Sequence, residues 1–198
     1  MRVIAGRARG RRLVAPAGAA ARPTTDRVKE SVFAALGDAR LRGAVVLDLY
    51  AGSGALAIEA LSRGATQAVL VDRERAALEV IARNLDATGL ATHARVQRGA
   101  AEGFLRRVPP AEAPFDLVFL DPPYEQPVAE LETVLAGLSR PGWLASAATV
   151  VVERGARGAD HPAWPEGWAT TWERSYGDTL VTVATADDQV ADTPAAEE

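Results

Sequence analysis

The stretch at residues 44–57, AVVLDLYAGSGALA, constrains the fold of this chain more than any other part of the sequence. A short run of β-branched and aliphatic residues leads to Asp48, and helix-forming residues begin at Ala55. An apolar run of this length predicts a buried parallel strand, and the apolar spacing after Gly54 predicts a helix. The sequence therefore predicts a strand, a tight glycine turn and a helix.

Two glycines in this turn, Gly52 and Gly54, suggest that it holds a polar ligand. Glycine adopts positive φ readily and has no side chain to keep a ligand away from the backbone. The helix that follows directs unpaired N–H groups and its positive dipole end toward such a ligand. Residues 52–57 also fit the dinucleotide fingerprint G-x-G-x-x-G/A, and Asp72 ends the next apolar run, where a ribose-binding acid is expected. A cofactor with a ribose is predicted, against the alternative that the glycines only pack helix on strand.

The length of 198 residues predicts one domain with small appendages, since 48% of the residues are hydrophobic and can form one well-buried core. No apolar stretch approaches the roughly 18 residues of a membrane span, and no apolar segment follows the basic N-terminus. We therefore expect a cytoplasmic protein. The chain has no cysteine, which excludes thiolate metal sites and every mechanism that needs a cysteine nucleophile. His93 and His161 are isolated in the sequence, so no metal site is predicted.

Positive charge is concentrated at the N-terminus. Residues 1–30 have eight basic and two acidic side chains, a net charge of +6, whereas the remainder has 14 basic and 24 acidic ones. A basic segment on an acidic body suggests a polyanionic partner, because arginine guanidinium groups suit phosphate oxygens. The alternative is a solvated tail that reflects an arginine-rich composition, since the chain has a single lysine. The candidate phosphate contacts are Arg2, Arg7, Arg9, Arg11, Arg12, Arg22 and Arg27.

The first 40 residues predict a basic hairpin and a helix. Two short strands, at 3–4 and 13–14, flank a basic turn that contains glycine. Residues 24–26 supply helix caps, and the apolar stripe that follows ends near Gly37. We expect this helix to pack on the main domain and to place the basic hairpin beside the cofactor site.

From residue 44 onward strands and helices alternate, which predicts a mostly parallel, doubly wound α/β sheet. The predicted strands are 44–50, 67–72, 92–98, 115–121 and 147–153, and the predicted helices are 54–63, 74–87, 101–107 and 127–138. Two later β-rich stretches, 169–176 and 179–185, are joined by Gly177-Asp178 and predict an antiparallel hairpin. We expect the four tryptophans to serve packing and the acidic residues 187–198 to be disordered.

A second candidate site follows the fourth predicted strand, where FDLVFLDPPY occupies residues 115–124. Open α/β sheets bind ligands beyond the carboxyl ends of their strands, so residues 121–124 should lie beside the glycine turn. Two prolines remove backbone donors and leave carbonyl acceptors, while Asp121 adds a carboxylate and Tyr124 a ring. Two acceptors and a ring suit a planar base with an exocyclic amine. The alternative is a proline turn that only ends the strand.

Together these motifs resemble the Class I S-adenosylmethionine-dependent amino-methyltransferases, in which a [DNS]-PP-[YFW] motif marks methylation of a nucleobase or amide nitrogen. The resemblance becomes closer with RVIAGRARG at 2–10, RPTTDRVKE at 22–30 and LDLYAGSGALAIEALSRGA at 47–65. Over residues 1–185 the chain resembles the bacterial 16S ribosomal RNA (guanine(966)-N(2))-methyltransferase family (RsmD-like).

This resemblance implies a Rossmann-like methyltransferase domain at residues 41–186, a basic RNA-binding hairpin and helix at 1–40, and an acidic tail at 187–198. It implies methyl transfer from S-adenosylmethionine to N2 of a specific guanine in 16S ribosomal RNA, without a metal. The enzyme would be a monomer that acts on a small-subunit assembly particle, which its N-terminal arginines contact. The implied catalytic residues are Asp121, Pro122, Pro123 and Tyr124. The implied cofactor-binding residues are Asp48, Tyr50, Ala51, Gly52, Ser53, Gly54, Asp72, Arg73, Gly99, Ala100, Ala101 and Asp121.

One departure from the family pattern follows the third predicted strand. Such enzymes usually carry an acid or amide there to bind the adenine amine, whereas this chain has residues 98–101, RGAA. Backbone groups or Glu102 would have to take that role.

Two other functions stay open. A DNA or other RNA adenine N6-methyltransferase shares DPPY, although no target-recognition insertion is visible in 198 residues. The alternative from another class is a noncatalytic RNA-binding Rossmann module. A cytosine carbon-methyltransferase is excluded, because it needs a cysteine nucleophile.

Overall fold

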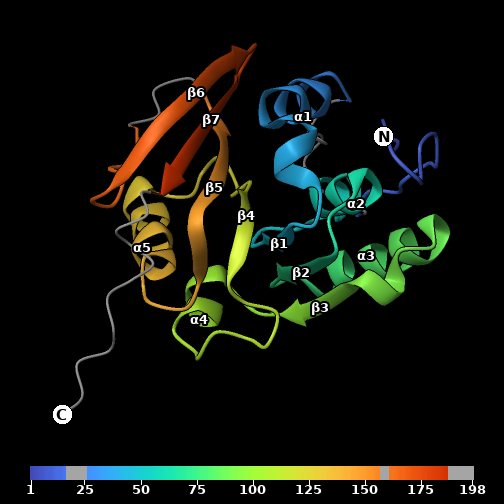
Figure 1. Ribbon diagram of the computed structural model, residues 1–198, viewed down its shortest axis with the longest axis horizontal. Helices are drawn as coiled ribbons and strands as arrows, with labels where there is room; N and C mark the ends of the chain where they lie inside the picture. Colours follow the sequence, from blue (N-terminus) through green and yellow to red (C-terminus); the bar gives the residue numbers. More distant parts are fainter. Residues whose placement is uncertain (17–25, 157–160, 187–198) are drawn as a thin grey trace.

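A seven-stranded sheet in the order β3-β2-β1-β4-β5-β7-β6 runs through the middle of the molecule (Figure 1). The computed structural model describes residues 1–16, 26–156 and 161–186. The strands are β1 (Val45–Asp48), β2 (Gln67–Asp72), β3 (Ala94–Arg98), β4 (Phe115–Leu120), β5 (Leu144–Gly155), β6 (Trp168–Tyr176) and β7 (Thr179–Ala186). Strands β1 to β5 pair in parallel, whereas β7 pairs antiparallel with both β5 and β6. The predicted mostly parallel sheet with a C-terminal antiparallel hairpin is confirmed.

Helices cover both faces of this sheet (Figure 1). They are α1 (Asp26–Leu41), α2 (Ala55–Arg63), α3 (Arg75–Thr88), α4 (Ala101–Leu105) and α5 (Val128–Leu138), and a 3-10 helix, η1 (Ala91–His93), precedes β3. Helices α1, α2 and α3 pack on one face, and α4 and α5 pack on the other. Across the described ranges, no helix has both the length and the apolar character needed to cross a bilayer.

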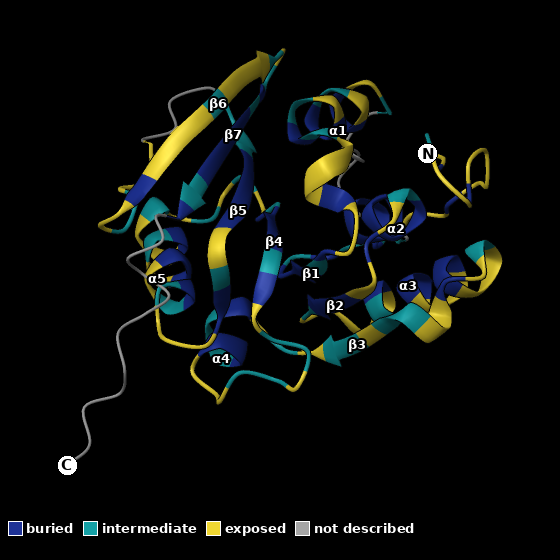
Figure 2. Ribbon diagram, in the orientation of Figure 1, coloured by how far each residue is buried: buried dark blue, intermediate teal, exposed yellow. Residues whose placement is uncertain are grey.

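Successive side chains of the central strands enter two different cores. In β1, Val46 belongs to the core under α1, α2 and α3, whereas Leu47 belongs to the core under α4 and α5. Phe119 and Leu120 of β4 divide in the same way. Because both faces are covered, these strands have the continuous apolar sequences that identified them. Figure 2 shows the central strands buried and the edge strand β6 largely exposed.

Several predicted boundaries are wrong by a few residues. Strand β1 ends at Asp48 because the chain leaves the sheet there to form the glycine turn. The predicted strand at 92–98 begins instead at Ala94, after η1. Helix α1 continues past a kink at Gly37, where φ is 70°, and β5 is longer than predicted because it pairs with β7 as far as Gly155.

The N-terminal hairpin is part of the same core as α1 and α2. The predicted strands at 3–4 and 13–14 are wrong as regular strands: Arg2 and Arg12 form one isolated bridge, and the Val3 N–H donates to the Arg11 carbonyl at 2.9 Å. Val3 is fully buried and packs in this core. The predicted caps at 24 and 25, Arg22 and the acidic tail lie outside the described residues.

The tryptophans serve packing, as predicted. Trp143 is buried and meets Phe104 edge-on at a centroid distance of 5.4 Å. Trp168 is also buried and stacks on Trp164 at 6.0 Å, while Trp172 packs against the opposite core. These rings cover the apolar layers and leave the carboxyl ends of the parallel strands to other residues.

A buried ion cluster fastens the hairpin and α1 to α2. Glu59 of α2 has no exposed surface and accepts the N–H groups of Ile4 at 2.8 Å and Ala5 at 3.0 Å. The Nζ of Lys29, also buried, lies 3.5 Å from Glu59 Oε2, and Arg63 Nε donates to Oε1 at 2.8 Å. Burial lowers the pKa of Lys29, and the Glu59 carboxylate opposes this shift. Each buried charge has a partner, as its removal from water requires.

We expect Glu59→Ala to lower the free energy of unfolding by about 3–5 kcal/mol, because Lys29 would stay buried without its nearest carboxylate. Urea unfolding measures this loss. Glu79→Ala is the matched control, since Glu79 accepts from Arg75 at 3.1 Å with the same spacing of four residues, but on the exposed surface of α3. It should cost about 0.5 kcal/mol or less. Equal losses in the two variants would contradict the role of Glu59.

Candidate active site

The glycine turn joins β1 to α2 at the carboxyl ends of the parallel strands, and its two glycines serve different purposes. Gly52 and Gly54 have φ values of 55° and 77°. A Cβ at Gly54 would lie 3.1 Å from Leu70 Cδ2 and 3.3 Å from Ile58 Cδ1, so this glycine lets α2 pack on β2. A Cβ at Gly52 would meet nothing closer than 3.9 Å. Gly52 therefore leaves the backbone open to a ligand, while Gly54 serves packing.

One cavity of about 430 Å³ opens beyond the carboxyl ends of β1, β2, β3 and β4. This volume is typical of ligand sites, which measure roughly 300–1,000 Å³. The predicted site residues that line it are Tyr50, Gly52, Asp72, Arg73, Gly99, Ala100, Ala101, Asp121, Pro122, Pro123 and Tyr124. The predicted meeting of the glycine turn with residues 121–124 is confirmed. The other predicted cofactor residues do not line the cavity: Asp48, Ala51, Ser53 and Gly54.

Asp48 lies behind the cavity wall, with 2% of its surface exposed. Its carboxylate accepts the backbone N–H groups of Tyr50 and of Ala57 in the first turn of α2. Its Oδ1 is buried and has no hydrogen-bond partner in the described part of the chain. Burial raises the pKa of Asp48 to about 7, against the two backbone hydrogen bonds. The carboxylate therefore holds the turn together with one oxygen left unpaired.

Asp72 ends β2 and closes the glycine turn from the other side. Its Oδ2 accepts the Gly52 N–H at 2.8 Å, and its Oδ1 accepts the Glu74 N–H at 2.9 Å. The expectation that the turn presents its N–H groups to a ligand is therefore wrong for Gly52. Each carboxylate oxygen has further acceptor capacity, so Asp72 can still bind hydroxyl groups in the cavity.

The loop after β4 is held in place at several points. The Tyr124 hydroxyl lies 3.0 Å from the Thr179 hydroxyl, and Gln126 Nε2 donates to the Tyr50 hydroxyl at 2.9 Å. The Pro123 carbonyl is used inside the loop, where it accepts the Gln126 N–H at 2.9 Å. Burial raises the pKa of Tyr50 to about 12, so its hydroxyl stays protonated at neutral pH.

Acidic side chains dominate the cavity wall, including several that no sequence motif identified. The acidic residues that line it are Asp72, Glu74, Glu102, Asp121, Glu125 and Glu130, and Gln126 adds an amide. Arg73 is the one basic side chain among the described residues of the wall. Glu74 and Glu125 directly follow predicted site residues, which is the only local signal for them. The resulting negative potential favours a cationic ligand.

The N-terminal hairpin extends along α2. At its open end Asn84 Nδ2 donates to the carbonyls of Ser53 at 2.8 Å and Val14 at 2.9 Å. At its tip the Arg7 N–H donates to the Ser62 carbonyl at 2.8 Å, at the other end of α2. A helix of nine residues is about 13 Å long. The expectation that the hairpin lies beside the cofactor site is therefore correct for its open end and wrong for its basic tip.

The candidate phosphate contacts in the described residues are all exposed: Arg2, Arg7, Arg9, Arg11, Arg12 and Arg27. Arg2 Nε lies 3.6 Å from Asp26 Oδ2, and Arg7 Nη1 lies 3.3 Å from His93 Nε2. Exposed pairs of this kind are weak in water, so phosphate groups can replace them. The side chains are therefore available to a polyanion.

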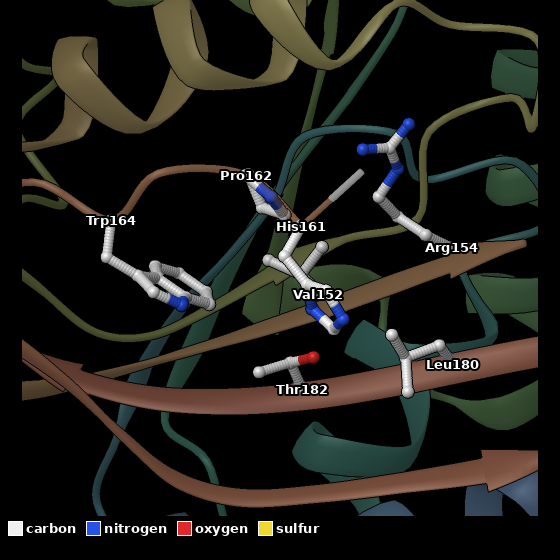
Figure 3. A pocket seen from close by; sticks show the side chains of 7 residues that line it. All are labelled: Val152, Arg154, His161, Pro162, Trp164, Leu180 and Thr182. Carbon is white, nitrogen blue, oxygen red and sulfur yellow. The ribbon is translucent and has the colours of Figure 1, made fainter. Parts of the chain in front are cut away.

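A second, much smaller cavity lies over β5 and β7 (Figure 3). Its volume is about 20 Å³, which is enough for about one water molecule. It is lined by Val152, Arg154, His161, Pro162, Trp164, Leu180 and Thr182. Within the described residues, no cluster of three or more histidine, aspartate or glutamate side chains is placed to hold a metal ion. The larger cavity is therefore the candidate active site.

Comparison with known proteins agrees with this assignment. A family model described as conserved hypothetical protein 95 matches residues 1–185. The ribosomal RNA small subunit methyltransferase D of Escherichia coli (strain K12) is 39% identical over 177 residues, 89% of this chain and 85% of that protein. YlbH of Bacillus subtilis (strain 168) is 47% identical over 136 residues, 68% of this chain and 73% of that protein. The solved structure of yhhF from Escherichia coli has a TM-score of 0.82 at 37% identity and covers 96% of this chain and 99% of that chain.

The raised pKa of Asp48 predicts a specific dependence of stability on pH. Because the native protein holds this proton up to about pH 7 while the unfolded chain releases it near 3.8, the free energy of unfolding should fall as pH rises between these values. Asp48→Asn removes the titration. Relative to the wild type, this variant should gain on the order of 2 kcal/mol between pH 5 and pH 8 in urea unfolding. Parallel stability curves would show that Asp48 titrates near its ordinary pKa.

Proposed function

The chain belongs to the conserved hypothetical protein 95 family, and on this premise we propose that it transfers a methyl group from S-adenosylmethionine to the exocyclic amine N2 of a specific guanine in 16S ribosomal RNA. The observation that carries the proposal is the single cavity shared by the Gly52 turn and the loop from Asp121 to Tyr124. One part of this cavity suits a nucleoside cofactor, and the other suits a base with an amine. Ribosomal RNA as substrate follows the name of the Escherichia coli relative.

The residues of the cavity fit S-adenosylmethionine, which is positively charged at its sulfur and amine groups. The acidic wall attracts such a cation, and the unpaired Oδ1 of Asp48 lies behind the wall formed by Leu49 and Tyr50. We assign the ribose hydroxyls to Asp72 and the adenine to residues 99–101. Glu102 lines the same region and is the candidate for the adenine amine. When bound, the cofactor supplies an electrophilic methyl group.

The loop after β4 prepares the nucleophile. The amine nitrogen of guanine is a poor nucleophile, because its lone pair is delocalised into the ring. The Asp121 carboxylate and the Pro122 carbonyl would accept its two N–H bonds and favour a pyramidal nitrogen whose lone pair is directed at the methyl group. The Tyr124 ring would stack on the base. Asp121 thus acts mainly by orienting the amine.

The substrate that we propose is folded RNA within a small-subunit assembly particle, bound in the cytoplasm by a monomer of this protein. A short loop cannot select one guanine among many, so other contacts must position the RNA. The tip of the hairpin at Arg7 lies at the far end of α2 from the cavity. An RNA that contacts both must therefore extend over at least about 13 Å, which favours a folded substrate over an isolated nucleotide.

Two rivals are separated from this proposal by one experiment. Purified protein, S-adenosylmethionine and small-subunit particles from cells that lack the protein are combined, and the 16S ribosomal RNA is mapped by mass spectrometry. A methyl group on a guanine amine is expected. Methyl transfer to adenine N6 would favour the adenine methyltransferase, and binding without methyl transfer would favour the noncatalytic module.

We expect Asp121→Ala to lower turnover about 100-fold or more at saturating cofactor, because one orienting interaction at the reacting amine is lost. Its affinity for S-adenosylhomocysteine, measured by calorimetry, should change little. Asp72→Ala is the comparison variant and should show the opposite pattern, with weaker binding by roughly 1.5–3 kcal/mol. Full turnover in the Asp121 variant would remove its proposed role.

Alanine at Arg7, Arg9, Arg11 and Arg12 should weaken binding to ribosomal RNA and reduce its salt dependence by about 0.7–0.9 in logarithmic slope per lost phosphate contact. Cofactor affinity should not change. The control is the double replacement of Arg75 and Arg83, which are exposed on α3. If the quadruple variant bound and methylated ribosomal substrate with an unaltered salt response, these arginines would be a solvated surface only.

A further inference from the structure

We propose that Gly155 and Thr179 are positioning residues that hold the Tyr124 ring as the flat surface against which the target base stacks. The inference rests on the proposed function, since a base acceptor is what gives the ring this use. Gly155 ends β5, Thr179 begins β7, and the two are directly paired across the antiparallel strands. The C-terminal hairpin thereby brings both residues to the carboxyl end of the sheet, beside the loop that carries Tyr124.

The contact at Gly155 concerns the ring. A Cβ at this position would lie 3.2 Å from Tyr124 Cδ1, 3.5 Å from Cγ and 3.7 Å from Cε1, so its three nearest neighbours are all ring atoms. Gly155 is not among the glycines with positive φ, so alanine would fit its backbone conformation. Glycine at 155 therefore leaves room for the ring to lie against the backbone of β5.

The contact at Thr179 fixes the other end of the same side chain. The Thr179 hydroxyl lies 3.0 Å from the Tyr124 hydroxyl, and Thr179 is buried. The ring is thus held at its Cγ–Cδ1 edge by Gly155 and at its hydroxyl by Thr179, while Tyr124 still lines the cavity. A ring fixed before the base arrives loses little conformational entropy on stacking, which improves the alignment of the amine.

Further bonds stabilise the strand end that carries Gly155. The Ala156 N–H donates to the Asp178 carbonyl at 2.7 Å, inside the turn that joins β6 to β7. Arg154 Nη2 donates to the Gln126 carbonyl at 3.2 Å, which connects β5 to the loop after β4. The hairpin of β6 and β7 therefore does more than complete the sheet, because it forms the support of the Tyr124 ring.

The first test is Gly155→Ala in wild-type and Tyr124→Ala backgrounds, with kcat, KM and single-turnover rates measured on small-subunit particles. With the ring present, the added methyl group should displace it by a few tenths of an ångström and lower kcat about tenfold, with cofactor affinity unchanged. In the Tyr124→Ala background the same substitution should have no further effect. Gly103→Ala is the control, because a Cβ there would meet only Arg106 Nη2, at 3.8 Å.

The second test is a double-mutant cycle of Tyr124→Phe and Thr179→Val, which each remove one hydroxyl of the same contact. The double variant should lose no more kcat than either single variant. This cycle decides the question if Tyr124→Ala shows no measurable turnover. A purely structural role would instead lower the thermal midpoint and give additive losses.

The outcomes separate the two proposals. Wild-type protein that methylates no guanine amine in 16S ribosomal RNA would overturn the proposed function. Wild-type methylation together with an equal effect of Gly155→Ala in both backgrounds, or additive effects of Tyr124→Phe and Thr179→Val, would overturn the positioning role alone.

Discussion

The glycine turn between β1 and α2 is the constraint on which the rest of the structure depends. Gly54 has no side chain to collide with Leu70, so α2 can lie directly on the sheet. Asp48 accepts an N–H of the first turn of α2, and Asp72 accepts the Gly52 N–H. Two carboxylates thus fix the turn from opposite sides. The direction in which α2 leaves the sheet follows from these contacts.

Helix α2 then organises the N-terminal part of the protein. Its buried Glu59 accepts two N–H groups of the hairpin and pairs with Lys29 of α1. Asn84 of α3 joins the carbonyl of Val14 to that of Ser53, in the glycine turn. The basic hairpin is therefore attached to the same turn that forms the cavity. Charge is separated along this assembly, with an acidic cavity at one end of α2 and the arginine-rich hairpin tip at the other.

The opposite side of the cavity depends on the antiparallel end of the sheet. Because β7 runs against β5, its first residue returns to the carboxyl end of the parallel strands, where Thr179 meets Tyr124. A parallel final strand would begin at the other end of the sheet and could not make this contact. The change of strand direction after β5 thus allows the C-terminal hairpin to support a loop that precedes it by some 55 positions in the sequence.

The sequence by itself determined the strand, glycine turn and helix at 44–57, the alternation of strands and helices, and the meeting of residues 121–124 with Gly52. These follow from local periodicity and from the rule that parallel strands direct their carboxyl ends to one edge of a sheet. Only the tertiary structure decided that Asp48 is buried behind the wall, that the Gly52 N–H binds Asp72, and that the hairpin tip lies away from the cavity. It also decided the contacts of Tyr124 with Gly155 and Thr179. Such contacts join residues far apart in the chain, and packing rather than any local pattern selects them.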